Sequence, residues 1–235
     1  MARKTRMYLG GVPAHIVQRG NNRQACFYSD DDYEFYLESL RKGLKRYQVE
    51  LHTYCLMTNH IHLLMTPIDE DGISRVIQHV GREYVRYLNK RYRRTGTLWE
   101  GRHKGSLVDA ENYLMACYRH IEMNPVAAHM VDSPEDYPWS SYGCNAKGET
   151  NSLLTPHSVY LRLDIDEKKR VNAYRALFEE RLSRVDINVV AAGVRSNIPT
   201  GNQRFRESIA EAIGRRVGDG KTGRPRNELV KKNSY

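Results

Sequence analysis

The chain has 235 residues, 40% of them hydrophobic, so it can bury a sizeable core in one large domain or in one domain with an appendage. Its 37 Lys and Arg against 28 Asp and Glu give a net charge of +9, which favours an anionic partner, nucleic acid above all. The four scattered cysteines form no CxxC pair, so we expect neither a zinc cluster nor a disulfide framework. No apolar run reaches the roughly 18 residues that cross a bilayer, so we expect no membrane segment. We therefore expect a cytoplasmic, nucleoid-associated protein.

The N-terminal part predicts a strand, a helix and a hairpin. Residues 14–20 favour a strand that runs into a loop at a glycine and two asparagines. Residues 29–48 open with Ser and Asp capping candidates and carry apolar residues at near-helical spacing, which predicts a helix. Residues 50–58 and 60–66 predict two strands with a tight connection around Thr58 and Asn59, hence an antiparallel hairpin.

The following elements complete an α+β pattern. Residues 72–96 place apolar side chains on one stripe and arginines around it, so they predict a second helix with a basic C-terminal end. A further strand is expected within 97–110, and a helix from residue 110 that ends near Pro125. This order predicts a ferredoxin-like antiparallel sheet with packed helices.

The rest of the chain differs in character and is expected to form a small, helical, basic C-terminal extension. We predict a core over 1–135, a connector over 136–165, and an extension over 166–235 with helices at 166–185 and 203–217. From residue 203 to 232 there are nine Lys and Arg against four Asp and Glu, a local net charge of +5. The end of this segment has few apolar residues, so we expect it to need an anionic partner to become ordered.

His60 and His62 interrupt the apolar run LMTNHIHLLMTP. Side chains two apart on a strand share a face, so the two imidazoles stand side by side, as in a metal site. Two histidines that hydrogen-bond across a sheet are the structural alternative. Neutral imidazoles suit first-row metals, and a third ligand with oxygen would leave positions for phosphate oxygens and admit Mg²⁺ or Mn²⁺.

Several motifs in order resemble one family: HIVQRGNNRQ, NHIHLL, RYRRTGTLWEGRHKGSL, IEMNPV, DYPWSSY and a closing GRP. Together they are similar to the REP-associated tyrosine transposases, members of the HUH class of single-strand DNA nucleases, over nearly the whole chain. The resemblance implies an HUH nuclease core in which the histidine pair binds a divalent ion that polarises a scissile phosphate. It also implies that a tyrosine on a following helix attacks this phosphate and becomes 5′-phosphotyrosyl.

The sequence departs from the family at that tyrosine. The residue directly before the IEMNP motif is His120, so the nucleophile cannot be carried over, and the site is either inactive or uses another tyrosine. Tyr118 lies about 200° around the helix from residue 120, whereas Tyr113 shares its face but lies roughly 10 Å away along the axis. Neither replaces the family tyrosine cleanly.

Two residues on this helix are candidate companions of the metal. Asn124 lies one turn after His120 and offers a carbonyl oxygen to the metal or the phosphate, or else caps the helix before Pro125. Glu122 lies one turn after Tyr118, and its carboxylate would be the stronger ligand for a hard metal if Tyr118 is the active tyrosine.

Basic residues interleaved with aromatic ones favour contact with single-stranded DNA, because phosphates attract cations and unstacked bases pack on aromatic rings. A solvated charged face is the alternative. The TGRPRN tail resembles an AT-hook core, whose arginines enter a narrow minor groove, and a solvated tail is equally compatible. The candidate DNA-binding residues are Arg19, Asn21, Asn22, Arg23, Arg93, Arg94, Arg102, Lys104, Arg224 and Arg226.

The leading hypothesis is a metal-dependent single-strand DNA endonuclease and strand transferase that acts at palindromic, hairpin-forming repeats. The alternative, favoured by His120, is a sequence-specific hairpin-binding protein of the same ancestry that no longer cleaves. A third class, a structural zinc site or a metal-dependent hydrolase without a covalent step, stays open. A homodimer is common among relatives of the family, and a monomer is equally compatible.

Overall fold

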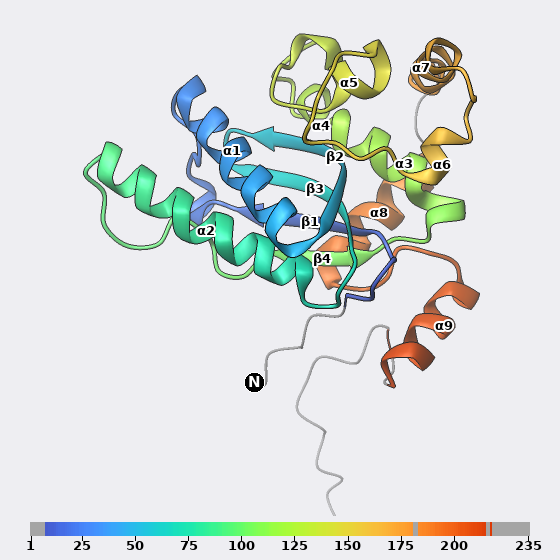
Figure 1. The fold of residues 1–235 in the computed structure, drawn as a ribbon, viewed down its shortest axis with the longest axis horizontal. Helices are drawn as coiled ribbons and strands as arrows, with labels where there is room; N and C mark the ends of the chain where they lie inside the picture. Colours follow the sequence, from blue (N-terminus) through green and yellow to red (C-terminus); the bar gives the residue numbers. More distant parts are fainter. Residues whose placement is uncertain (1–7, 181–182, 215–216, 218–235) are drawn as a thin grey trace, which may run out of the picture.

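A four-stranded antiparallel sheet forms the centre of the molecule. The computed structural model describes residues 8–180, 183–214 and 217. The strands are ordered β2-β3-β1-β4, and Figure 1 shows helices on both faces of the sheet. The strand bounds are Ala14–Arg19 (β1), Val49–Met57 (β2), His60–Pro67 (β3) and Lys104–Leu107 (β4). The predicted α+β architecture is confirmed.

The β2–β3 hairpin is joined by Thr58 and Asn59 alone, because Met57 pairs directly with His60. Nearly every residue of both strands is buried, as expected for strands covered on both faces. The register shifts once, between Leu51 and Thr53. Such a short turn fixes the register, and the register decides which face each histidine occupies.

Helices α1 (Asp30–Tyr47) and α2 (Gly72–Arg91) pack together on one face. Helix α1 begins with a capping box, in which Ser29 and Asp32 satisfy each other's backbone amides. Alternation along β3 directs Ile61, Leu63 and Met65 into the core beneath these helices. The helical residues buried there include Tyr33, Tyr36, Leu40, Leu44, Ile73, Val76, Ile77, Val80, Tyr84 and Leu88.

Helix α3 (Ala110–Glu122) covers the opposite face and is followed by the short helix α4 (Asn124–Ala127). Its apolar stripe forms a second core with Cys55, Met57 and Leu64 of the sheet. The stripe consists of Leu114, Cys117, Tyr118 and Ile121. The histidine face of β3 therefore meets α3.

The C-terminal helices lie around α3 and the edge of the sheet, except α9, which Figure 1 shows apart from the others. They are α5 (Tyr142–Lys147), α6 (Ser158–Leu161), α7 (Glu167–Ala176), α8 (Arg184–Ser196) and α9 (Gln203–Ile213). Helices α7 and α9 fall within predicted segments, whereas α8 was not predicted. The segment after α8 lies along β4, where Thr200 forms a parallel bridge with Val108 and donates its amide to Leu107. The edge strand is thus covered.

Candidate functional site

His60 and His62 lie on the face of β3 that meets α3. Their ring centroids are 5.0 Å apart, and Ile61 between them is fully buried on the other face. His60 and His62 thus lie side by side on the strand, as their spacing predicts. His60 is half-buried and His62 is buried, so the pair lies at the boundary between the protein interior and solvent.

Two further histidines from different elements complete the cluster. His15 of β1 lies across the sheet, and its Nε2 is 2.9 Å from Nδ1 of His62. His120 of α3 faces both: its ring centroid is 5.9 Å from that of His15 and 6.1 Å from that of His62. We call His15, His60, His62 and His120 the histidine cluster. The sequence pattern did not single out His15, although strand alternation places it on the same face as Val17 and Arg19.

All four imidazoles of the cluster are neutral near pH 7. Burial lowers the pKa of His60 and of His120 to about 4, and the charge of Arg19 adds to the effect at His60. Burial and the neighbouring histidines lower the pKa values of His15 and His62 well below the usual range. Neutral imidazoles keep a nitrogen lone pair, so they are suited to bind a metal or accept a proton.

The pair fits two positions of a metal site. Nδ1 of His60 is 2.6 Å from Oδ1 of Asn59, so it carries the proton and leaves the lone pair on Nε2. Nε2 of His15 can accept the Nδ1 proton of His62, and this tautomer leaves the lone pair of His62 on Nε2 for a metal. Within the described ranges, no three His, Cys, Asp or Glu side chains are arranged to hold an ion together. The remaining ligands would therefore have to be an amide oxygen, water or phosphate oxygens.

Tyr118 and Glu122 lie away from the cluster. Both are fully buried in the second core, where the ring of Tyr118 stacks on that of Tyr160. The carboxylate of Glu122 accepts hydrogen bonds from hydroxyls of Ser141 and Tyr174 and from Thr53 and Asn145. Since 118 and 122 share a helix face that points away from residue 120, the structure brings neither to His60 and His62.

Asn124 and Tyr113 have structural contacts in the same helix region. Nδ2 of Asn124 donates to the carbonyl of His120 at 2.7 Å, which satisfies an open carbonyl at the end of α3. Its Oδ1 has no hydrogen-bond partner within the described residues. Tyr113 packs, partly buried, against the second core.

Three loops meet at the end of the sheet beside His60. The amide of Gly20 donates to Asn59, that of Asn21 to Leu98, and that of Glu100 to Arg19. Arg19 pairs directly with His60 across the sheet. The predicted DNA-binding residues of the first loop thus come together with those of the 93–104 segment at this end of the sheet.

Most of these predicted residues are exposed. Asn21 and Arg94 are half-buried, and Asn22 and Arg23 adopt left-handed backbone angles, with φ of 52° and 59°. Trp99 is 7% exposed and belongs to the core, so it offers no free ring face. The exposed ones are Arg19, Asn22, Arg23, Arg93, Arg102 and Lys104. Arg224 and Arg226 lie outside the described residues.

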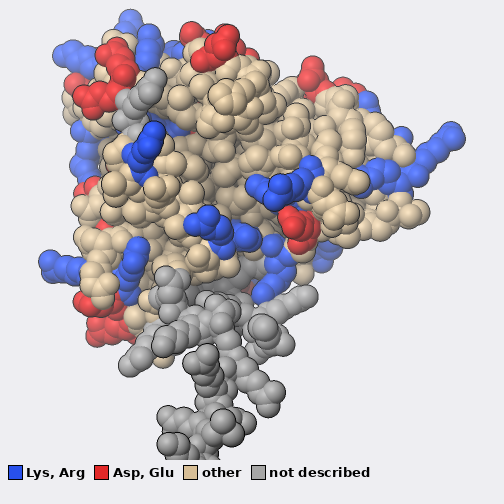
Figure 2. Space-filling view, turned by 180° about the vertical axis from the view of Figure 1, so that it is seen from behind, with Lys and Arg blue, Asp and Glu red and all other residues tan. Residues whose placement is uncertain are grey.

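A basic groove of about 700 Å³ runs between α2 and the sheet near Gln18. Among the described residues that line it, none is acidic and four are arginines: Arg75, Arg82, Arg86 and Arg102. On the face seen from behind in Figure 2, Lys and Arg side chains are spread among mostly uncharged residues. Basic surface therefore extends from the three loops along α2, in a form suited to phosphates.

Residues 10–124 match the family model "Transposase IS200 like". This part of the chain is similar to the IS200-like transposases. A protein of Haemophilus influenzae (strain ATCC 51907 / DSM 11121 / KW20 / Rd) that is assigned to the REP-associated tyrosine transposases is 26% identical to this chain over 133 residues. The match covers 52% of this chain and 75% of the relative, and it confirms the resemblance to that family.

Two solved structures are similar to parts of this chain. One is a REP-associated tyrosine transposase bound to a REP hairpin, with a TM-score of 0.54 and 17% identity over 67% of this chain and 93% of the other. This likeness shows the fold. A Deinococcus radiodurans R1 protein assigned as a transposase is 20% identical over 49% of this chain and 91% of the other, with a TM-score of 0.37. None of the described helices is long and apolar enough to cross a membrane.

Proposed function

We propose that this transposase nicks and rejoins single-stranded DNA at hairpin-forming repeats of the REP type. The observation that carries the proposal is the His60 and His62 pair, neutral and side by side at the end of the sheet where three loops with exposed arginines meet. A phosphate held by the arginines would reach the two imidazoles. The relative solved with a REP hairpin supports the choice of DNA form.

His60 and His62 would hold a divalent ion, Mg²⁺ or Mn²⁺, with the amide oxygen of Asn124 as a third ligand. When bound, the ion supplies a Lewis acid that polarises the scissile phosphate. The chain's own groups prepare the site: Asn59 and His15 fix the two ring orientations through Nδ1. Burial keeps both rings unprotonated, so they do not repel a cation.

The covalent step of such an enzyme needs a nucleophile beside the pair. The resemblance implies a phosphotyrosyl intermediate, but His120 is the residue of α3 that faces His62. We do not assign the step to Tyr118, because its hydroxyl is buried in the second core without a hydrogen-bond partner among the described residues. His120 is therefore the side chain of α3 placed closest to the reacting phosphate in this proposal.

The presence of His120 at the position of the family tyrosine, with Tyr118 buried, favours a second candidate function, hairpin binding without cleavage. In that case His120→Tyr should create a nicking enzyme, since the pair and the loops are in place. The test incubates purified protein with a hairpin-bearing single strand in Mg²⁺ or Mn²⁺ and follows nicked product and protein-DNA adduct. Nicking by the wild type supports the enzyme; hairpin binding without nicking supports the second candidate; neither binding nor nicking across many repeat sequences contradicts both.

A further inference from the structure

Tyr28 is an aromatic side chain that the fold leaves at the surface. It is 49% exposed, although the two residues before it, Cys26 and Phe27, are buried. Its ring lies beside that of Tyr92, with centroids 4.9 Å apart and planes tilted by 48°. Arg94 approaches from the same side, with Nη1 3.5 Å from the Tyr28 hydroxyl. About half of the Tyr28 side chain thus stays open to solvent despite these two contacts.

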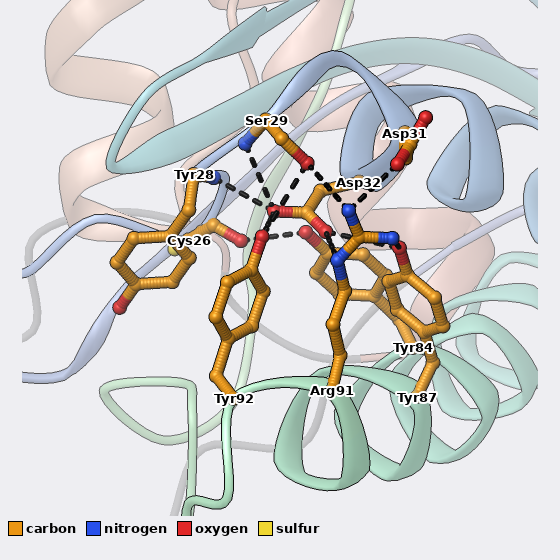
Figure 3. A network of polar contacts seen from close by, with 9 residues as sticks. All are labelled: Cys26, Tyr28, Ser29, Asp31, Asp32, Tyr84, Tyr87, Arg91 and Tyr92. Carbon is orange, nitrogen blue, oxygen red and sulfur yellow. Dashed lines mark hydrogen bonds and ion pairs between the residues drawn. The ribbon is translucent and has the colours of Figure 1, made fainter.

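A buried carboxylate holds this arrangement in place. Figure 3 shows Asp32 at the centre of a network that joins the start of α1 to the end of α2. Its Oδ2 accepts the amide of Tyr28 at 2.8 Å and the hydroxyl of Tyr92 at 2.9 Å, and its Oδ1 accepts the hydroxyl of Tyr87. One group thus fixes both the backbone that carries Tyr28 and the ring that supports it. The exposed ring is preorganised, so its binding partner need not order it.

Arginines surround the two rings. The guanidinium of Arg91 lies 5.7 Å from the ring centroid of Tyr92 and forms an ion pair with Asp31. Arg93 is exposed in the loop that follows and Arg94 is half-buried beside Tyr28. An exposed aromatic ring flanked by cations matches a nucleotide, whose base stacks on the ring while its phosphate meets the cation.

The ring lies within a few nucleotides of the histidine pair. The amide of Cys26 donates to the carbonyl of Thr58 at 2.6 Å, and that of Phe27 contacts the same oxygen. Thr58 is in the turn that leads directly into His60. Two residues of chain on each side of this hydrogen bond limit the separation of Tyr28 and His60 to about 20 Å between Cα atoms.

We propose that Tyr28 is a stacking platform for one unpaired base of single-stranded DNA next to the histidine pair. The inference rests on the proposed function and adds to it a contact to a base. Trp99 is buried and Tyr92 is half-buried behind Tyr28, so Tyr28 is the ring of this group that a base can reach. Stacking is tolerant of sequence, because every base has a ring face.

The test uses photocrosslinking and affinity with the full chain. The probe is a DNA hairpin with oligothymidine flanks that carry a single 5-iodouracil at successive distances from the stem, because iodouracil crosslinks to an aromatic ring stacked on it. The variants are Tyr28→Phe, which keeps the ring, and Tyr28→Leu, which removes it. Ile165→Ala is the matched surface control, since Ile165 is 99% exposed between α6 and α7. Thermal unfolding checks that all variants are folded.

We expect a crosslink to Tyr28, found by mass spectrometry, for one flank position and its neighbour. Tyr28→Leu should lose that crosslink and weaken binding of the flanked hairpin roughly 5- to 150-fold, the range for one stacked base, while Tyr28→Phe and Ile165→Ala stay within about twofold. A hairpin without flanks should bind Tyr28→Leu and wild type alike. Wild-type binding with no crosslink at Tyr28 and no loss in Tyr28→Leu overturns the platform and leaves the proposed function standing. Failure of the wild type to bind either probe overturns both.

Discussion

Nε2 of His15 lies 2.9 Å from Nδ1 of His62, a contact between neighbouring strands that the HUH motif alone does not contain. His15 is 1% exposed, and its other nitrogen, Nδ1, has no hydrogen-bond partner among the described residues. The contact with His62 is therefore the polar interaction that orients the His15 ring. The same contact holds the His62 ring so that its Nε2 points away from the His15 ring. His15 is therefore a positioning residue.

Removal of this contact should weaken metal binding without unfolding the site. We expect His15→Ala to lower the affinity for Mn²⁺ by about 10- to 100-fold, the usual effect of losing a partner behind a metal-binding histidine. His15→Gln can place its amide oxygen near the position of Nε2, where it accepts from Nδ1 of His62, and should recover most of the loss. Mn²⁺ binding measured by electron paramagnetic resonance reports this directly. Equal affinities for wild type and both variants would mean that His15 only fills space.

Glu122 should make stability depend on pH. Burial raises the pKa of this carboxyl in the folded protein, despite hydrogen bonds from Ser141, Tyr174, Asn145 and Thr53 that act in the opposite direction. A raised folded pKa means that the folded state binds the proton more tightly than the unfolded chain. The resulting stability is fully present below the unfolded pKa and is lost as pH rises through the folded pKa.

The measurement is urea unfolding of wild type and Glu122→Gln from pH 4.5 to 8. The difference in unfolding free energy should shift in favour of the glutamine variant as pH rises, by at most about 1.4 kcal/mol per pH unit. The glutamine amide can donate to the Tyr174 hydroxyl, which now donates to Oε2 of Glu122 at 2.7 Å. A difference that is constant across this pH range would show that Glu122 has the same pKa folded and unfolded.

The Asp32 network should be worth more than the neighbouring surface ion pair. Asp32 is fully buried and accepts hydrogen bonds from two backbone amides and two tyrosine hydroxyls. In Asp32→Asn the NH2 group of the side chain faces some of these donors, so the free energy of unfolding should fall by about 1–3 kcal/mol. Asp31→Asn is the control: Asp31 is exposed and pairs with Arg91 at 2.6 Å, so its loss should cost less than about 1 kcal/mol. Chemical denaturation compares the two, and similar costs would contradict the ranking.

The strand-by-strand prediction worked where local patterns decide the structure. The Thr58 and Asn59 turn, the paired faces of His60 and His62 and the burial of Ile61 follow from strand alternation and a short connection. Contacts between side chains that tertiary packing brings together could not be predicted. His15 joins the cluster because β1 pairs with β3 rather than β2, and Trp99 is buried by α2, neither of which a local pattern records.

Helix α3 and the C-terminal extension illustrate the same limit. Helical geometry separated Tyr118 from His120 correctly, but only tertiary structure brings Ser141, Asn145 and Tyr174 to Glu122. Helix α8 was not predicted, because its valines, its isoleucine and its glycine have weak helix propensity. Its contacts with α3 and β4 supply the stability that the local sequence lacks.

The basic segment after Gly218 should act on duplex DNA rather than on the nick. Truncation there removes five Lys and Arg, at positions 221, 224, 226, 231 and 232. We expect nicking of a short hairpin to stay nearly unchanged, while binding to DNA with a long duplex stem weakens and its salt dependence flattens by about three to five units of slope, nearly one per cation lost. Titrations of both forms of the protein at several salt concentrations measure this. Identical slopes on duplex-bearing DNA would mean that the segment does not contact phosphates.

The most direct test of the central claim is nicking of hairpin-bearing single strands by wild type, His60→Ala, His62→Ala and His120→Tyr, with adducts separated on denaturing gels. We predict Mg²⁺- or Mn²⁺-dependent nicking by the wild type and none by the two alanine variants, which keep hairpin affinity within a few fold because phosphate contacts dominate binding. His120→Tyr should form a stable adduct, and Tyr118→Phe and Tyr113→Phe should behave as wild type. Nicking that persists in both alanine variants, or a wild type that neither binds nor nicks any hairpin, would contradict the histidine pair as the active site.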